Sequence, residues 1–136
     1  MKIFIIGGAG YIGSHMVKIA HKAGHDVITV DNLSTGYQDA VLYGEFELCD
    51  ILDATKLDKL FKKHKPDAVM HFSAYSLVGE SMTDPYKYYN NNVSGTLSLL
   101  KAMIDNNCMK FIFSSSAAIF GNPEYIPIDE NHPKNP

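Results

Sequence analysis

The chain has 136 residues, enough for one domain with a buried core, and its 46% hydrophobic and 20% charged residues are ordinary for a globular protein. Its net charge of −3 gives no general attraction to nucleic acid or to an anionic membrane. The apolar run before the first glycines, Ile3–Ile6, is too short for a signal peptide or a membrane span. Cys49 and Cys108 lack the spacing of metal or redox motifs, so we expect two free thiols in a cytoplasmic protein.

The chain begins with a pattern typical of a strand, a glycine loop and a helix. Lys2–Ile6 is a short run of mostly branched apolar residues, which predicts a buried strand. Apolar residues at helical spacing then predict a helix over Tyr11–Ala23, followed by a glycine. Asp26–Val30 is the second predicted strand, with Asp31 at its end, and the polar stretch Asn32–Gly36 is a loop.

The middle of the chain repeats the alternation. Glu45–Leu48 predicts a third, weaker strand. Asp53 is suited to cap a helix that ends in the cationic run Lys62–Lys65, which favours the negative end of the helix dipole, and a proline follows. Asp67–His71 predicts the fourth strand, in which His71 is expected to be a packed core histidine rather than a base.

The last third predicts one long helix and one strand. Asp84 and Pro85 form a helix start, with a cap before a proline at the first position. The helix extends to about Asn106, and the fifth strand is Lys110–Ser114, after which no periodicity follows Gly121. The apolar residues of the helix lie on one face: Tyr89, Val93, Leu97, Leu100 and Ile104.

Strand and helix thus alternate along the chain, with short connections. This pattern predicts an α/β fold: a Rossmann-like, doubly wound parallel sheet of about five strands in the order 3-2-1-4-5, with helices on both faces. In such sheets, ligands bind at the carboxyl ends of the strands, where the strand order reverses between strands 1 and 4.

The glycine loop after the first strand carries the main functional signal. Gly7, Gly10 and Gly13 match a spacing in which glycines form a tight turn, leave bare backbone beside a pyrophosphate and let the helix pack closely. Gly8 adds the alternative G-x-G-x-x-G match. The free N–H groups of the helix start attract phosphate. Asp31 lies 18 residues after Gly13, close to the spacing that reaches ribose hydroxyls. The alternative is that the glycines serve only as turn residues and Asp31 is a solvated loop acid.

Asp31 also favours NAD over NADP as the cofactor. Its carboxylate would repel the 2′-phosphate of NADP, and the chain contains no arginine to bind that phosphate. A lysine would act only as a point charge there.

Six segments resemble one known family, the extended short-chain dehydrogenase/reductases, and within it the sugar-nucleotide 4-epimerase branch. The glycine loop and the serine run are shared widely in that superfamily, whereas the two middle segments point to the epimerase branch. The segments are Gly7–His15, Asp31–Gly36, Cys49–Ile51, His71–Ser81, Tyr88–Thr96 and Phe111–Gly121.

The resemblance implies a role for each matching residue. Tyr11 and Ile12 would contact the pyrophosphate through their backbone. The adenosine ribose would be wrapped by Asp31, Asn32, Leu33, Ser34, Thr35 and Gly36, and the adenine bordered by Asp50 and Ile51. The middle of the cofactor would pass Phe72, Ser73 and Ala74, with Asn91 on the nicotinamide side and Ser114 also at the cofactor. Ser116 would bind the 4-hydroxyl of the sugar as a catalytic residue, although the run Ser114–Ser116 also fits a merely polar strand end. Ser76 departs from some epimerases, which carry a lysine there.

The resemblance implies NAD-dependent interconversion of UDP-glucose and UDP-galactose by inversion at C4, in galactose metabolism. In that branch a Tyr-x-x-x-Lys pair removes the 4-hydroxyl proton, and none of the eight tyrosines here is followed by lysine four residues later. We therefore expect residues 1–136 to be the NAD-binding domain of a homodimeric parent enzyme, without its later strands and sugar-nucleotide part. The isolated chain would be inactive and prone to self-association.

Two other functions remain open at this point. One is a different sugar-nucleotide dehydratase or epimerase of the same family, and the other is a non-catalytic NAD-binding module. No metal site is expected, because His21 and His25 have helical spacing but no third ligand and an intervening glycine.

Overall fold

Five parallel strands form the centre of the structure, a computed structural model that describes residues 1–136. Their order is β3-β2-β1-β4-β5, so the predicted topology is confirmed. The registers pair Ile6 with Val30 on one side and with His71 on the other, which brings the carboxyl ends of β1, β2 and β4 together. The strands are β1 (Lys2–Ile6), β2 (Asp26–Asp31), β3 (Glu45–Leu48), β4 (Ala68–His71) and β5 (Phe111–Phe113).

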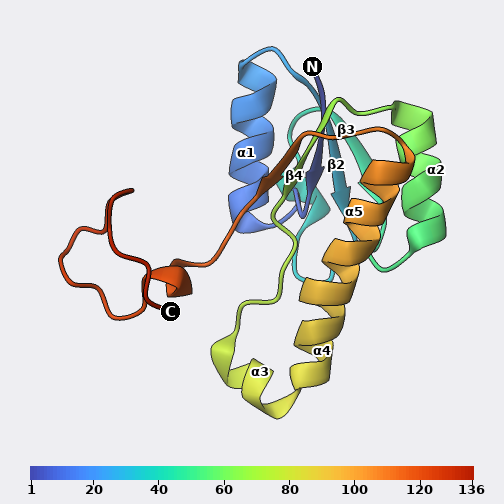
Figure 1. The fold of residues 1–136 in the computed structure, drawn as a ribbon. Coiled ribbons are helices and arrows are strands. Elements are labelled where there is room, and N and C mark those ends of the chain that lie inside the picture. Colours follow the sequence, from blue (N-terminus) through green and yellow to red (C-terminus); the bar gives the residue numbers. More distant parts are fainter.

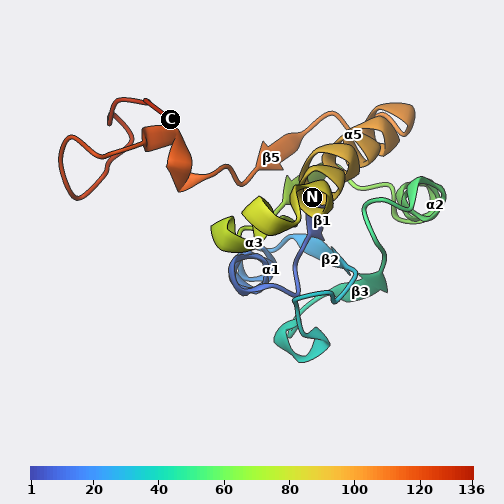
Figure 2. The same cartoon turned by 90° about the horizontal axis from the view of Figure 1, so that it is seen from below.

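Helices cover both faces of the sheet, with α1 on one face and α2 and α5 on the other (Figures 1 and 2). Asp53 caps α2, since its Oδ1 accepts the Lys56 N–H at 2.9 Å, and Lys65 ends it in the left-handed conformation. The helices are α1 (Tyr11–Lys22), α2 (Ala54–His64), α3 (Val78–Thr83), α4 (Pro85–Tyr89) and α5 (Thr96–Asp105), with short helical turns η1 (Gln38–Ala40), η2 (Asn90–Gly95) and η3 (Ala117–Phe120). None of these helices combines the length and apolarity needed to cross a membrane.

The two-sided core follows from the alternation of side chains along β1. Ile3 and Ile5 pack toward α1, where Val17 and Ala20 are buried with them. The residues between them, such as Phe4, pack toward α2 and α5, and the Phe4 ring meets the Phe61 ring edge-on at 5.0 Å. A parallel sheet needs this burial on both faces, which explains why β1 is apolar throughout.

The long helix predicted from Pro85 to Asn106 is one helical run, but it ends at Asp105 and contains a π-helical turn, η2. Most of its predicted apolar stripe does not face the core: Tyr89, Val93, Leu97 and Ile104 are exposed, and only Leu100 packs against the core. The buried residues are instead one or two positions away: Tyr88, Asn91, Gly95, Leu99, Ala102 and Met103. Leu99, Ala102 and Met103 of this face belong to the main core, and Gly95 packs against the Ile51 side chain, where a Cβ atom would lie 2.5 Å from Ile51 Cδ1.

Three other features differ from the sequence prediction. The helix α3 was not expected, because a six-residue helix offers too few turns for a periodic pattern. The fifth strand is limited to Phe111–Phe113, and α1 buries Gly13, Val17 and Ala20 while Ile12 and Ile19 are exposed. In both helical segments a glycine lies on the buried face: Gly13 of α1 lies against the glycine loop, and Gly95 of η2 lies against the Ile51 side chain.

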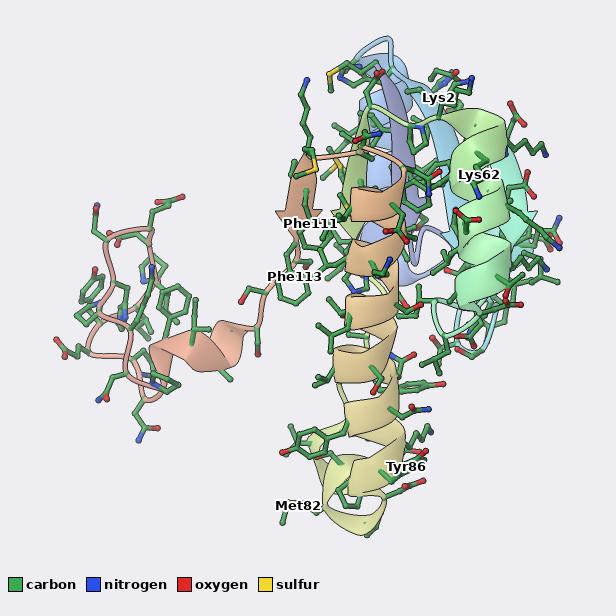
Figure 3. All side chains as sticks on the ribbon, turned by 45° about the vertical axis from the view of Figure 1, so that its right-hand side comes forward. Lys2, Lys62, Met82, Tyr86, Phe111 and Phe113 are labelled. Atoms are coloured by element: carbon green, nitrogen blue, oxygen red, sulfur yellow. The ribbon has the colours of Figure 1, made fainter.

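The edge strand β5 is less covered than the rest of the sheet. Figure 3 shows Phe111 and Phe113 on the side of β5 nearest α5. Ile112 lies between them and faces the opposite side of the sheet, because side chains alternate along a strand. Ile112 and Phe113 are 55% and 54% exposed. After β5 the chain leaves the sheet (Figure 1) and folds around His132, whose ring packs against Phe120 and Tyr125.

Candidate functional site

The loop between β1 and α1 requires glycine for two physical reasons. Gly7 has φ +78°, a left-handed conformation, and a Cβ atom there would lie 2.7 Å from the Ser73 backbone nitrogen. A Cβ atom on Gly13 would overlap the carbonyl oxygen of Gly7. The loop therefore lies against the start of α1 and the segment after β4, with bare backbone facing the space between them.

Asp31, at the end of β2, holds this loop from below. Its Oδ2 accepts the Ala9 N–H at 3.0 Å, and its Oδ1 accepts the Leu33 N–H at 2.8 Å. Asp31 is buried. Each carboxylate oxygen has more than one lone pair, so Asp31 retains acceptor capacity for hydroxyl donors.

The segment after β2 is tied to the segment after β3 through a pair of polar side chains. Asn32 Nδ2 donates to Asp50 Oδ2 at 2.8 Å, and Asn32 Oδ1 accepts the Ser34 N–H at 3.0 Å. Asp50 Oδ1 in turn accepts the Leu52 N–H at 2.8 Å. These bonds fix a polar platform beside Asp31, in the region where sequence analysis placed the adenosine.

A pocket lies at the carboxyl ends of β1, β2 and β4, at the predicted reversal of strand order. Its lining brings together the glycine loop, the end of β2, the segment after β4 and the π-helical turn. All but one of the eleven lining residues are predicted cofactor residues; Tyr75 is the exception. They are Gly7, Gly10, Asp31, Asn32, Ser34, Thr35, Phe72, Ser73, Ala74, Tyr75 and Asn91.

The other predicted residues lie around the pocket or away from it. Tyr11 and Ile12 are exposed on the first turn of α1, and Gly13 is buried beneath them. Leu33, Gly36 and Asp50 belong to the loops that border the pocket, whereas Ile51 is in the hydrophobic core. Ser114 and Ser116 are on the exposed segment after β5, where Ser116 Oγ accepts the Ala118 N–H at 3.1 Å.

Sequence reasoning missed Tyr75, and no local signal marks it. It follows the predicted segment Phe72–Ala74 directly, but its contacts come from residues remote in sequence. The Tyr75 backbone is bonded to Asn92, and its ring lies under the Lys87 ammonium at 4.5 Å.

His71 links the sheet to the π-helical turn beneath the pocket. Thr96 Oγ1 donates to the Asn92 carbonyl at 2.7 Å, so it accepts the bond from His71 Nε2–H at 3.0 Å. The Ser73 N–H donates to His71 Nδ1 at 3.4 Å. Both ring nitrogens are thus used by a neutral imidazole, and the expectation of a packed core histidine is confirmed because His71 is 2% exposed.

Comparison with known proteins places this architecture in a family. A family model described as "NAD dependent epimerase/dehydratase family" matches residues 3–136. The chain belongs to this family. It is 52% identical to a curated UDP-glucose 4-epimerase of Lactobacillus helveticus, over 100% of this chain and 42% of that protein. The chain therefore spans less than half the length of this epimerase/dehydratase relative.

Solved structures of epimerase/dehydratase members agree with the fold. A UDP-glucose 4-epimerase from Brucella ovis in complex with NAD superposes with a TM-score of 0.90 at 47% identity, covering 99% of this chain and 42% of that one. A UDP-glucose 4-epimerase from Bifidobacterium longum in complex with NAD+ and UDP gives a TM-score of 0.88 at 35% identity, covering 99% and 43%.

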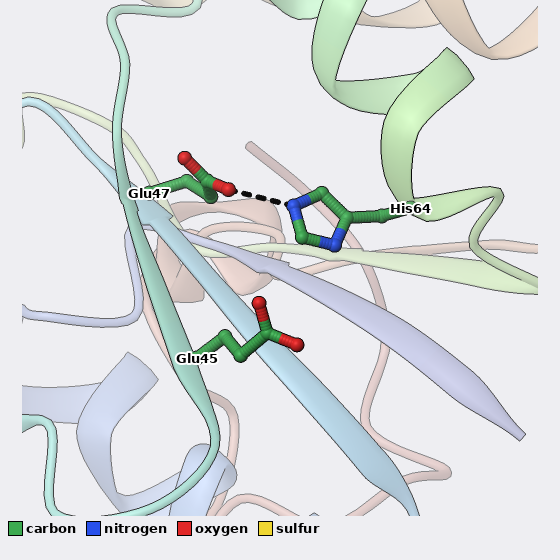
Figure 4. A group of neighbouring side chains, drawn as sticks. All are labelled: Glu45, Glu47 and His64. Atoms are coloured by element: carbon green, nitrogen blue, oxygen red, sulfur yellow. Dashed lines mark hydrogen bonds and ion pairs between the residues drawn. The ribbon is translucent and has the colours of Figure 1, made fainter.

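One side-chain cluster of this epimerase/dehydratase chain has metal-ligand chemistry but is already an ion-pair network. Glu45 and Glu47 project from the same face of β3 toward His64 at the end of α2 (Figure 4). His64 Nε2 lies 2.7 Å from Glu47 Oε1, and the Lys63 ammonium lies 2.5 Å from the same oxygen. The Lys63 bond holds the pKa of Glu47 below its usual value. A metal ion would have to displace Lys63 from Glu47. The contacts of Lys63 and His64 with Glu47 instead join α2 to the edge strand β3.

The neutral state of His71 predicts a pH dependence of stability. Burial lowers the pKa of His71 from 6.5 to about 4. The unfolded chain therefore binds this proton first, and the stabilisation present above pH 6.5 is lost as the pH falls toward 4. At pH 5 the loss amounts to about 2 kcal/mol of the free energy of unfolding.

Urea unfolding at pH 7 and pH 5 measures this effect. We expect His71→Gln to be less stable than the unmodified chain at pH 7 but to lose less stability between the two pH values. His15→Gln, at an exposed histidine of α1, is the control and should keep the full loss. An unchanged pH dependence in His71→Gln would contradict the assignment.

Proposed function

We propose that this chain binds NAD in the pocket at the ends of β1, β2 and β4. The observation that carries the proposal is the position of the Asp31 carboxylate directly beneath the glycine loop, with the start of α1 beside it. The first turn of α1 contains no acidic residue, so its N–H groups and dipole are free to attract phosphate. Gly7 and Gly10 line the pocket without side chains and leave room for a pyrophosphate.

The same pocket favours NAD over NADP. Asp31 presents a carboxylate at the end of β2, where a 2′-phosphate would be repelled, and the chain has no arginine to offset that repulsion. Ribose hydroxyls, by contrast, are hydrogen-bond donors that the remaining lone pairs of Asp31 can accept.

For a protein of the length of its relatives, we propose 4-epimerisation of UDP-glucose and UDP-galactose, as part of galactose metabolism. Bound NAD supplies reversible hydride acceptance from C4 of the sugar. Ser116 would hydrogen-bond the 4-hydroxyl, a role supported by its exposed position on the segment leaving β5. The Tyr-x-x-x-Lys motif, whose tyrosine would act as the base, does not occur within these 136 residues. We therefore propose that residues 1–136 bind the cofactor only, as an NAD-binding domain.

Self-association and location are further parts of the proposal. The apolar stripe on α4, η2 and α5 is exposed, with Tyr86 at 77%, Tyr89 at 70% and Leu97 at 61%, and would pair two copies as a homodimer. Figure 3 shows Tyr86 and Met82 at the projecting end of this helical arm. A cytoplasmic location is supported by Cys49 and Cys108, which are buried and not joined in a disulfide. No nucleic-acid partner is proposed.

Calorimetric titration of the purified chain with NAD, NADP and UDP-glucose tests the proposal. We expect NAD to bind and NADP to bind at least about tenfold more weakly, a difference of about 1.4 kcal/mol. UDP-glucose should not bind to residues 1–136 alone. A folded chain that binds neither dinucleotide would overturn the proposed function, and equal binding of NAD and NADP would overturn the role given to Asp31.

A further inference from the structure

Two residues of the pocket wall are held by a residue that does not line the pocket. Asn92 Oδ1 accepts the Tyr75 N–H at 2.9 Å and also a hydrogen from Asn91 Nδ2 at 2.9 Å. Asn92 Nδ2 donates to the Tyr75 carbonyl at 2.9 Å. Tyr75 and Asn91 both line the pocket, whereas Asn92 faces the hollow between α3 and α4. One amide side chain therefore joins the segment after β4 to the helical arm.

The π-helical turn fixes the place of this amide. Asn92 lies within η2, and its carbonyl accepts the Thr96 hydroxyl at 2.7 Å, which is itself bonded to His71 of β4. π-helical turns are rare, and they occur often at functional sites because they redirect side chains from the ordinary helical positions. Here the turn contains both Asn91, which lines the pocket, and Asn92, which holds the Tyr75 peptide of the pocket wall.

The ring of Tyr75 is held separately. The Lys87 ammonium lies over it, and Lys87 also pairs with Glu80 Oε1 at 2.6 Å. The Tyr88 hydroxyl donates to Glu80 Oε2 at 2.7 Å, and its ring centroid is 5.7 Å from that of Tyr75. These contacts are partly solvent-exposed and contribute modestly. The Tyr75 peptide is fixed by Asn92 on both its N–H and its C=O.

We propose that Asn92 is a positioning residue of the dinucleotide site, which sets the pocket wall by holding the Tyr75 peptide and the Asn91 amide together. The inference rests on the proposed NAD binding for its ligand, but the clamp itself exists in the unliganded chain. Without Asn92, the segment from Ser73 to Tyr75 loses its attachment to η2, and the wall must be ordered again each time NAD binds. The cost of that ordering appears as weaker binding.

Three variants test the clamp. Asn92→Ala removes all three bonds, and Asn92→Asp keeps the acceptor for Tyr75 and Asn91 but loses the donor to the Tyr75 carbonyl. Asn90→Ala, an asparagine of the same turn for which no side-chain hydrogen bond is found, is the control. The two measurements are hydrogen exchange of the Tyr75 amide without NAD, and the calorimetric Kd for NAD.

We expect Asn92→Ala to speed exchange of the Tyr75 amide at least about tenfold and to raise the Kd for NAD about tenfold, the effect of losing roughly 1.4 kcal/mol. Asn92→Asp should recover most of the exchange protection, and Asn90→Ala should match the unmodified chain.

If the unmodified chain does not bind NAD, the proposed function fails, and hydrogen exchange of the Tyr75 amide alone decides whether the clamp exists. Unchanged exchange in Asn92→Ala overturns the clamp, as does unchanged NAD affinity in a binding-competent chain. If Asn92→Ala does not fold, Asn92→Asp decides the clamp, because it keeps the acceptor for the Tyr75 N–H; a Tyr75 amide that exchanges without protection in Asn92→Asp overturns it.

Discussion

Gly13→Ala is expected to destabilise the chain by about 3 kcal/mol and to abolish dinucleotide binding. A Cβ atom at this position would overlap the carbonyl oxygen and carbon of Gly7, and backbone atoms cannot move aside as a flexible side chain can. The first turn of α1 would have to separate from the glycine loop, which opens the floor of the pocket. Urea unfolding and calorimetric titration with NAD measure the two effects.

Gly79→Ala is the matched control for this substitution. Gly79 lies in a helix, α3, as Gly13 lies in α1, but nothing is within 4 Å of a Cβ atom placed there. Alanine should be neutral or stabilising by up to about 1 kcal/mol, because it favours helix more than glycine does. A Gly13→Ala chain as stable as Gly79→Ala would contradict the close packing of α1 on the loop.

Asp31→Ala should lower the affinity for NAD about a hundredfold, equivalent to about 2.8 kcal/mol, and the stability of the chain by about 1–3 kcal/mol. The stability loss arises because the Ala9 N–H, bonded to Asp31 at a buried position, is left without an acceptor. The affinity loss arises because the loop is no longer held and the ribose hydroxyls lose their carboxylate. The same titration and unfolding experiments apply.

Asp26→Ala is the control at the opposite end of the same strand. Its carboxylate is largely exposed and forms a 3.6 Å ion pair with Lys2, so its removal should cost less than about 1 kcal/mol and leave NAD affinity unchanged. Should both aspartates affect NAD binding equally, the effect would be one of overall charge, and the local role of Asp31 would be wrong.

The sequence predicted most of the pocket because its residues form short, contiguous motifs. The glycine loop and the segment Phe72–Ala74 each follow a buried strand, Asp31 ends another, and the carboxyl ends of parallel strands meet at one edge. The strand order was predicted for the same reason, since alternating strands and helices leave few topologies. Tyr75 was missed because its position depends on Asn92 and Lys87, which no local pattern connects to it.

The amino-acid sequence by itself determined the five strands, their order and most of the residues at the carboxyl edge, because local periodicity and glycine spacing act over a few neighbouring residues. Only the tertiary structure decided which helix faces are buried. Hydrophobicity favours the stripe of Tyr89 and Leu97, yet the buried face carries Asn91 and Gly95. Gly95 packs against the Ile51 side chain and Asn91 lines the pocket, so the contacts made by remote residues, which no local pattern shows, decided the buried face there.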